Sequence, residues 1–143
     1  MKISQVLREK GDYVAAIAQE DSVADALNLL VEKKIGAVVA EDGDGRISGV
    51  LSERDIIFGL STYGESVLEK RVSELMSPQL HTCAPGDTMF KAMSMMTGRR
   101  VRHIPIVEEG ELKGIVSVGD VVKARIAEIE QEAEALREYI NSA

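Results

Sequence analysis

Two serine and aspartate pairs with the same internal spacing recur in the sequence. Ser52 precedes Asp55 by three positions, and Ser117 precedes Asp120 by three positions, 65 residues further along the chain. Each pair follows a short apolar run and begins a segment with helical periodicity, so each is predicted to lie at a helix N-terminus. Backbone N–H groups at that end of a helix attract anions, and an aspartate offers two acceptor oxygens to a sugar diol. The residues therefore indicate a site for a sugar-phosphate, with Arg54 as a further phosphate contact.

The same pairs allow a purely structural interpretation. In a capping box, the hydroxyl and the carboxylate three positions later satisfy only the backbone N–H groups of their own helix. Two observations favour a ligand: the pair is duplicated, and a dense basic run at 99–103 lies in a chain of formal charge −7. Such a run attracts an anion. Because side chains alternate along a strand, Arg102 and His103 are expected to point to opposite faces.

The elements that must position these pairs are themselves repeated. Residues 22–27 match 88–93, and residues 35–39 match 101–105, both at a spacing of 66 positions. The one-residue difference falls in the acidic turn between the paired strands, where a change of length costs least. Each copy is predicted to run strand, helix, strand, strand, helix. The predicted strands are 13–18, 35–40 and 46–51 in the first copy and 80–84, 101–107 and 112–118 in the second.

Helices are predicted where apolar residues recur with a helical period. A short amphipathic helix that ends at Gly11 precedes the first copy, and Ser22 caps the first helix of that copy. The next helix begins at Ser52, and the last runs from about Gly119 to the end of the chain. Residues 61–70 show no strong period and are interpreted as the connection between the copies.

Composition excludes several classes of function. The acidic balance and an aromatic content of 3% make the chain a poor candidate for holding a phosphate backbone or stacking bases, so no nucleic-acid partner is expected. No apolar run approaches the ~20 residues that span a bilayer, and the charged N-terminal segment does not resemble a signal peptide. We therefore expect a cytoplasmic protein with no membrane partner.

Catalytic and metal sites also find little support in the residue pattern. Cys83 is the single cysteine and has no activating base nearby in the pattern, so no enzyme activity and no catalytic residue are predicted. His81 and Cys83 share one face of the predicted strand 80–84, which hints at a metal. No third ligand accompanies them, and we predict no metal site.

The repeated pattern resembles the cystathionine-beta-synthase (CBS) domain. The residues that carry this resemblance are a capped helix, the strand end Ile104-Pro105-Ile106-Val107, an acidic turn, and Gly114-Ile115-Val116-Ser117 before Asp120. Two such domains in tandem resemble a Bateman module, and the likeness covers roughly residues 1 to 125. The predicted fold is α+β, with two pseudo-symmetric βαββα repeats packed as one module and a C-terminal amphipathic helix. The expected boundaries are 1–64 for the first repeat, 65–125 for the second and 126–143 for the helical extension.

The resemblance implies two clefts, related by pseudo-twofold symmetry, that bind adenine nucleotides. Similar modules most often bind AMP, ADP or ATP, and occasionally NAD or S-adenosylmethionine. By resemblance, Asp120 would accept hydrogen bonds from the ribose hydroxyls and Ser117 would face the phosphate. Thr82 and the backbone around His103, Ile104 and Pro105 would line the adenine pocket.

The first copy departs from this pattern. Ser52 and Asp55 occupy the equivalent positions, but Ala37 and Val38 replace the histidine and isoleucine of the second copy. The predicted nucleotide-binding set is Thr82, Arg102, His103, Ile104, Pro105, Ser117, Asp120, Arg54, Ser52, Asp55, Ala37 and Val38.

Apolar residues in the last helix follow a heptad seam. Their spacing alternates between four and three: Val122, Ile126, Ile129, Ala133, Leu136 and Ile140. The first part of the helix is expected to pack on its own core. We interpret the part beyond about Glu130 as a contact with a second copy of the chain, which predicts a homodimer. A solvated tail is the alternative, because fewer than about four heptads are present.

The predicted function is a regulatory sensor. A nucleotide that prefers one arrangement of the two repeats would shift the population toward it, and a protein target would respond to that arrangement. The alternative is a scaffold without a ligand that dimerises and docks on another protein.

Overall fold

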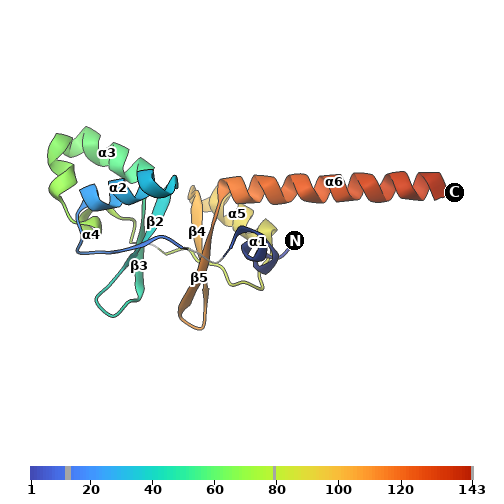
Figure 1. The fold of residues 1–143 in the computed structure, drawn as a ribbon, viewed down its shortest axis with the longest axis horizontal. Helices are drawn as coiled ribbons and strands as arrows, with labels where there is room; N and C mark the ends of the chain where they lie inside the picture. The colour runs from blue at the N-terminus through green and yellow to red at the C-terminus, as the bar shows by residue number, and fades with distance from the viewer. Residues whose placement is uncertain (12–13, 79, 143) are drawn as a thin grey trace. The chain divides into compact units, whose positions relative to one another are not determined.

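The computed structural model describes residues 1–11, 14–78 and 80–142 and divides the chain into two compact units (Figure 1). The first-repeat unit comprises residues 13–81 and 109–113, and the second-repeat unit comprises residues 1–12, 82–108 and 114–143. Both units contain strands and helices, with antiparallel pairs of strands, so the predicted α+β class is confirmed. Tyr13, where the first predicted strand begins, lies outside the described residues.

A three-stranded sheet forms the centre of the first-repeat unit. Strand β1 (Ala16–Ala18) runs parallel to β2 (Ala37–Glu41), which is antiparallel to β3 (Ile47–Ser52). The apolar residues of β2 are buried, as expected for the central strand of a sheet. Helices α2 (Val23–Lys33) and α3 (Glu53–Tyr63) complete the unit's repeat. The order strand, helix, strand, strand, helix is therefore confirmed for the first copy.

Local capping explains where α2 begins. The Ser22 hydroxyl accepts a hydrogen bond from the Asp25 backbone N–H at 3.1 Å, which satisfies one donor that the helix cannot pair itself. Val23, Ala26 and Leu30 form the buried face of the helix. Burial of that stripe provides most of the helix's stability, since a helix of this length is marginal in water.

The connection between the copies is more ordered than predicted. Helix α3 continues to Tyr63, and a 3-10 helix, η1 (Gly64–Glu69), follows it directly. The reason is packing: Val67 is fully buried and lies so close to α3 that a Cβ on Gly59 would be 2.7 Å from its side chain. Helix α4 (Val72–Leu75) then ends before Pro78, because the residue before a proline is disfavoured in helical geometry.

A two-stranded hairpin replaces the three-stranded sheet in the second repeat. Strand β4 (His103–Glu108) pairs with β5 (Glu111–Ser117). The predicted strand 80–84 is wrong, because it reduces to a single parallel bridge between Cys83 and Ile106. Pro85 has no N–H to donate, which prevents the ladder from continuing. The bridge still repeats the pairing of Ile17 with Ala40 in the first copy.

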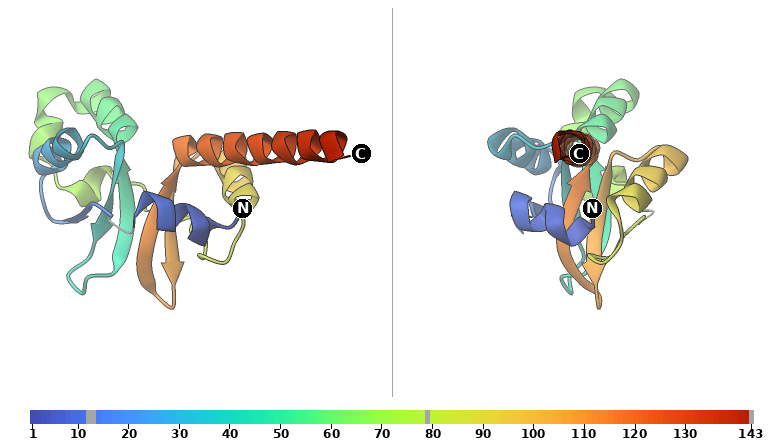
Figure 2. Two further views of the ribbon diagram at one scale, coloured as in Figure 1. Left: turned by 45° about the vertical axis from the view of Figure 1, so that its right-hand side comes forward. Right: turned by 90° about the vertical axis from the view of Figure 1, so that its right-hand side faces the viewer.

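Three helices pack against this hairpin, namely α1 (Ile3–Lys10), α5 (Met89–Arg99) and α6 (Val118–Ser142). Helices α1 and α5 lie on opposite sides of the hairpin (Figure 2). Although α1 precedes the first repeat in the chain, it belongs to the second-repeat unit. Its Leu7 touches the strand at Gly114, where an added Cβ would lie 2.6 Å from the leucine Cδ2. That glycine therefore permits the close approach of α1.

Candidate functional site

The first serine and aspartate pair lies where β3 meets α3. The Asp55 backbone N–H donates to the Ser52 hydroxyl at 3.2 Å, and the Ser52 N–H donates to Asp55 Oδ2 at 2.9 Å. These two reciprocal bonds form a capping box. Strand pairing fixes the place of the junction, because Ser52 lies opposite Ala37 on β2.

The second pair forms the same arrangement where β5 meets α6. The Ser117 N–H donates to Asp120 Oδ2 at 2.8 Å, and the Asp120 N–H donates to the Ser117 hydroxyl at 3.3 Å. That hydroxyl also donates to Oδ2 at 3.1 Å. The predicted capping interpretation is therefore realised at both junctions. The carboxylate oxygen that it uses is Oδ2 of Asp120.

Lys10 also lies at the second junction. It is not among the site residues predicted from the sequence. Its ammonium lies 2.7 Å from Asp120 Oδ2 and 2.8 Å from the carbonyl oxygen of Ile115. A lysine ammonium has three N–H donors, and these contacts use two of them. The structure thus places a cation and a carboxylate with remaining donor and acceptor capacity side by side at a helix N-terminus. The last residue of α1 supplies the cation, which explains why α1 matters to this site.

Opposing effects set the acidity of Asp120. Partial burial alone would raise the pKa of its carboxyl group, because a charged group loses hydration. Hydrogen bonds from Lys10 and from the Ser117 backbone, together with the lysine charge, outweigh burial and hold the pKa below its ordinary value of 3.8. Asp120 is therefore ionised at neutral pH and acts only as an acceptor.

The remaining predicted residues of the second copy lie on β4 and beside it. The Val118 N–H donates to the Arg102 carbonyl at 3.0 Å, which holds the start of β4 next to the junction. Arg102 is exposed and precedes β4, whose first residue, His103, is half-buried, so the predicted alternation of the two side chains along one strand stays a prediction. Ile104 and Pro105 are fully buried, and their side chains belong to the core. Thr82 is exposed beside Cys83, whose N–H donates to the Pro105 carbonyl at 3.2 Å.

The first copy repeats this geometry with different side chains. The Glu53 N–H donates to the Gly36 carbonyl at 2.9 Å, in the same way as Val118 and Arg102 one repeat later. Ala37 and Val38 are buried, and Arg54 is exposed. A shallow groove of about 480 Å³ lies beside this junction, but Ser52 and Asp55 do not line it. Its lining residues are Leu27, Leu30, Val31, Lys34, Ile35, Gly36 and Glu53.

Metal binding and membrane insertion receive no support from the described part of the chain. No group of three or more histidine, cysteine, aspartate or glutamate side chains is arranged to hold a metal ion within residues 1–11, 14–78 and 80–142. Among the same residues, no helix has the length and hydrophobicity needed to cross a bilayer.

Burial raises the pKa of the Cys83 thiol, which lies in the core of the second-repeat unit.

Comparison with known proteins gives consistent matches. The family model for the CBS domain matches residues 10–62 and 72–127. The mitochondrial CBS domain-containing protein CBSX3 of Arabidopsis thaliana is 32% identical over 146 residues, which cover 96% of this chain and 71% of that protein.

Solved structures agree with the sequence matches. The CBS-domain containing protein ATU1752 from Agrobacterium tumefaciens superposes with a TM-score of 0.84 at 39% identity, over 87% of this chain and 92% of that one. The structure of CBSX2 in complex with AMP superposes with a TM-score of 0.72 at 26% identity, over 88% of this chain and 96% of that one.

Proposed function

Because the chain belongs to the CBS-domain family and carries two copies of the domain, we propose that it is a regulatory module that binds AMP. The observation that carries the proposal is the second junction, where ionised Asp120 and Lys10 meet at the N-terminus of α6. Support from a relative comes from CBSX2, whose structure contains AMP. ADP, ATP and NAD are the competing ligands within the same chemical class.

In the proposed complex, Oδ1 of Asp120 accepts hydrogen bonds from the ribose diol. The N-terminus of α6 and the Ser117 hydroxyl face the phosphate, which the helix dipole favours. The third N–H of Lys10 is available to the same ligand. Its charge favours an anionic nucleotide over a neutral nucleoside.

The adenine base would lie against Thr82 and the backbone of residues 103–105, and Arg102 would add positive charge nearby. The first copy provides an equivalent set with fewer polar side chains. That set comprises Ser52, Asp55, Ala37 and Val38, with Arg54 as a phosphate candidate.

The proposed activity is regulation, with no catalysis. Nucleotide binding favours one arrangement of the two repeats, and a protein target responds to that arrangement. The module acts as a homodimer. A cytoplasmic location stays a prediction, because the name of one relative places that protein in mitochondria.

A scaffold without a ligand is the second candidate function. The observation that favours it is the row of exposed apolar side chains on α3, which includes Ile57, Phe58 and Tyr63. Exposed apolar patches of this kind mark protein interaction sites. Such a scaffold would use the serine and aspartate pairs only as helix caps.

Thermal unfolding with AMP, ADP, ATP, NAD and S-adenosylmethionine separates the two functions. A ligand at about 100 times its dissociation constant stabilises the folded state by ~2.7 kcal/mol, which raises the melting temperature by several degrees. We expect AMP to produce this shift. No response to any of the five compounds would refute nucleotide binding and favour the scaffold.

Asp120→Ala tests the assigned residue and should abolish the AMP response while the circular dichroism spectrum is retained. Asp87→Ala is the matched control, because Asp87 also accepts a backbone N–H, from Ala84 at 2.8 Å, and pairs with a lysine. An AMP response that survives in Asp120→Ala would refute the ribose assignment.

A further inference from the structure

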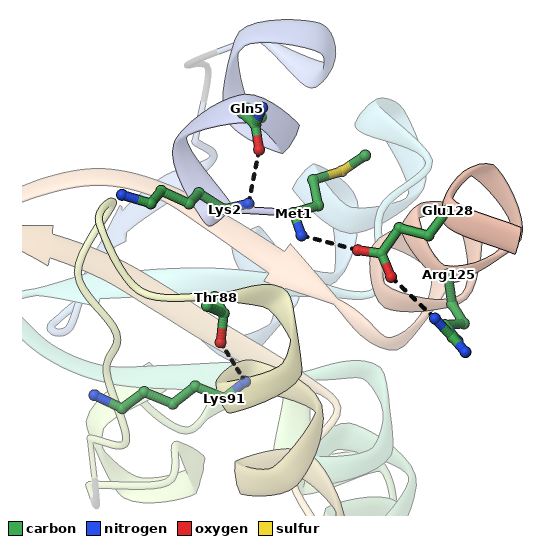
Figure 3. Close-up of polar contacts among 7 residues, drawn as sticks. All are labelled: Met1, Lys2, Gln5, Thr88, Lys91, Arg125 and Glu128. Carbon is green, nitrogen blue, oxygen red and sulfur yellow. Dashed lines mark hydrogen bonds and ion pairs between the residues drawn. The ribbon is translucent and has the colours of Figure 1, made fainter. Parts of the chain in front are cut away.

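The C-terminal part of helix α6 is exposed to solvent. Glu128 links α6 to the N-terminus of the chain: its Oε1 lies 2.9 Å from the amine of Met1, and its Oε2 lies 3.2 Å from Arg125 Nη1 (Figure 3). From there α6 runs past α1 and α5 to its C-terminal end (Figure 1). Within 129–142, each residue except the half-buried Ala133 is exposed.

The exposed segment presents an apolar stripe. Ile129, Leu136 and Ile140 retain 50%, 59% and 62% of their accessible surface. An isolated helix of fewer than about 12–15 residues is marginal in water, and packing of an apolar face normally stabilises it. The stripe continues the heptad seam that begins at Val122 and Ile126, both of which are also exposed. The complete seam therefore faces away from the core of its own unit.

Charged residues beside the seam identify the partner. With Ile126, Ala133 and Ile140 at a positions, the flanking g positions are Arg125 and Glu132, and the flanking e positions are Glu130 and Arg137. In a parallel pair of identical helices, each g residue faces the e residue five positions later on the other helix. Arg125 then faces Glu130, and Glu132 faces Arg137. Both contacts join opposite charges, and twofold symmetry produces each of them twice.

An antiparallel pair of the same helices brings like charges together. In the register that pairs every seam position, Ile126 of one copy lies beside Leu136 of the other. The e positions then face each other and so do the g positions, so that Glu130 meets Glu130 and Glu132 meets Glu132. Like charges in those places are destabilising.

Competing contacts within one helix do not remove this preference. Arg125 pairs with Glu128, and Arg137 lies 3.8 Å from Glu134. In both pairs the arginine is exposed and the spacing is three residues, and surface pairs of this kind contribute little to stability. Their arginines can therefore turn toward a second helix at small cost.

We propose that α6 forms a parallel two-stranded coiled coil with α6 of a second copy of this chain. The proposal rests on the homodimer of the proposed function and specifies its geometry. It does not require the nucleotide. The charge pattern determines the parallel orientation, and the apolar stripe provides the attraction.

A disulfide cross-link tests the orientation in the full chain. In the parallel pair, residue 140 of one copy lies beside residue 140 of the other, so I140C should give a covalent dimer on oxidation with diamide. E138C is the matched control, because position 138 lies on the outer side of the helix and should cross-link much less. The native Cys83 is only 3% exposed and should not compete. Equal cross-linking of the two variants would overturn the proposal.

Mixed variants distinguish the antiparallel arrangement. In that geometry residue 140 faces residue 122, so V122C mixed with I140C would cross-link while I140C alone would not. This result would overturn the parallel orientation and leave the homodimer intact. A monomer at all concentrations in sedimentation would overturn both. Nucleotide binding is measured separately by thermal unfolding and is unaffected by either result.

Charge reversal provides an independent check by sedimentation. E132R places an arginine opposite Arg137 of the other copy, and R137E places two glutamates together, so each variant alone should dimerise roughly fivefold more weakly. An equimolar mixture restores opposite charges at this contact in the mixed dimer and should recover dimerisation close to that of the unmodified chain. Failure of the mixture to recover would overturn the assigned contacts.

Discussion

Replacing Lys10 by methionine removes the cation that faces Asp120 while keeping the length of the side chain. The lysine side chain is 35% exposed and the aspartate side chain 19% exposed, so the pair lies between a surface ion pair and a buried one. A surface pair contributes about 0–1 kcal/mol, and a hydrogen bond to a charged group about 1.5–3 kcal/mol. Allowing for solvent screening, we expect Lys10→Met to lower the free energy of unfolding by about 1 kcal/mol at pH 7.

Acid pH should remove this difference. The pKa of Asp120 is lower in the folded state than its ordinary value of 3.8, so its ionisation stabilises the fold above that value. As the pH falls below 3.8 and through the folded pKa, the carboxylate is protonated and the ion pair is lost. Urea unfolding of wild type and Lys10→Met should therefore differ at pH 7 and converge at low pH.

A double-mutant cycle assigns the effect to the pair. Lys10→Met combined with Asp120→Asn should show a coupling energy of about 1 kcal/mol, since the second change removes nothing further from a broken pair. Lys91→Met is the matched control, because its ion pair with Asp87 lies at the N-terminus of α5 and does not touch the proposed site. Zero coupling at pH 7, or a difference that persists in acid, would refute this reasoning.

Two further predictions concern packing. Gly49→Ala should destabilise the fold by about 1–3 kcal/mol in urea unfolding, because the new Cβ meets the Ser77 carbonyl oxygen at 2.7 Å, while Gly43→Ala, which meets nothing within 4 Å, should have little effect. Val67→Ala should lower the free energy of unfolding by at least about 1 kcal/mol, because the valine is fully buried, whereas exposed Ile57→Ala should change it much less. Equal destabilisation by the two glycine variants, or by Val67→Ala and Ile57→Ala, would contradict this packing.

Local patterns could be read from the sequence with good accuracy. The helix starts at Ser22 and Ser52 were predictable because a capping residue and the apolar period lie within a few positions of each other. Both serine and aspartate pairs occupy the expected junctions for the same reason. The sequence repeat also predicted that the second junction would have the same local structure as the first. The capping hydrogen bonds are the same at the two junctions.

Contacts between distant residues could not be predicted. Lys10 and Asp120 are separated by 110 positions, and the repeat contains no equivalent of Lys10 that would have identified it. The packing of α1 on the second-repeat unit depends on Gly114, whose role appears only when Leu7 is placed beside it. Likewise, η1 is held by burial of Val67, which with Leu68 provides the few apolar residues of an otherwise polar stretch.

Calorimetric titration of the unmodified chain with AMP and with its 2′-deoxy and 3′-deoxy analogues tests the central claim most directly. A hydrogen bond to a charged group contributes about 1.5–3 kcal/mol, so loss of a ribose hydroxyl that meets Asp120 should weaken binding about tenfold or more. AMP binding with weaker binding of at least one analogue is the predicted result. Equal affinity for all three compounds, or no binding of AMP, would contradict it.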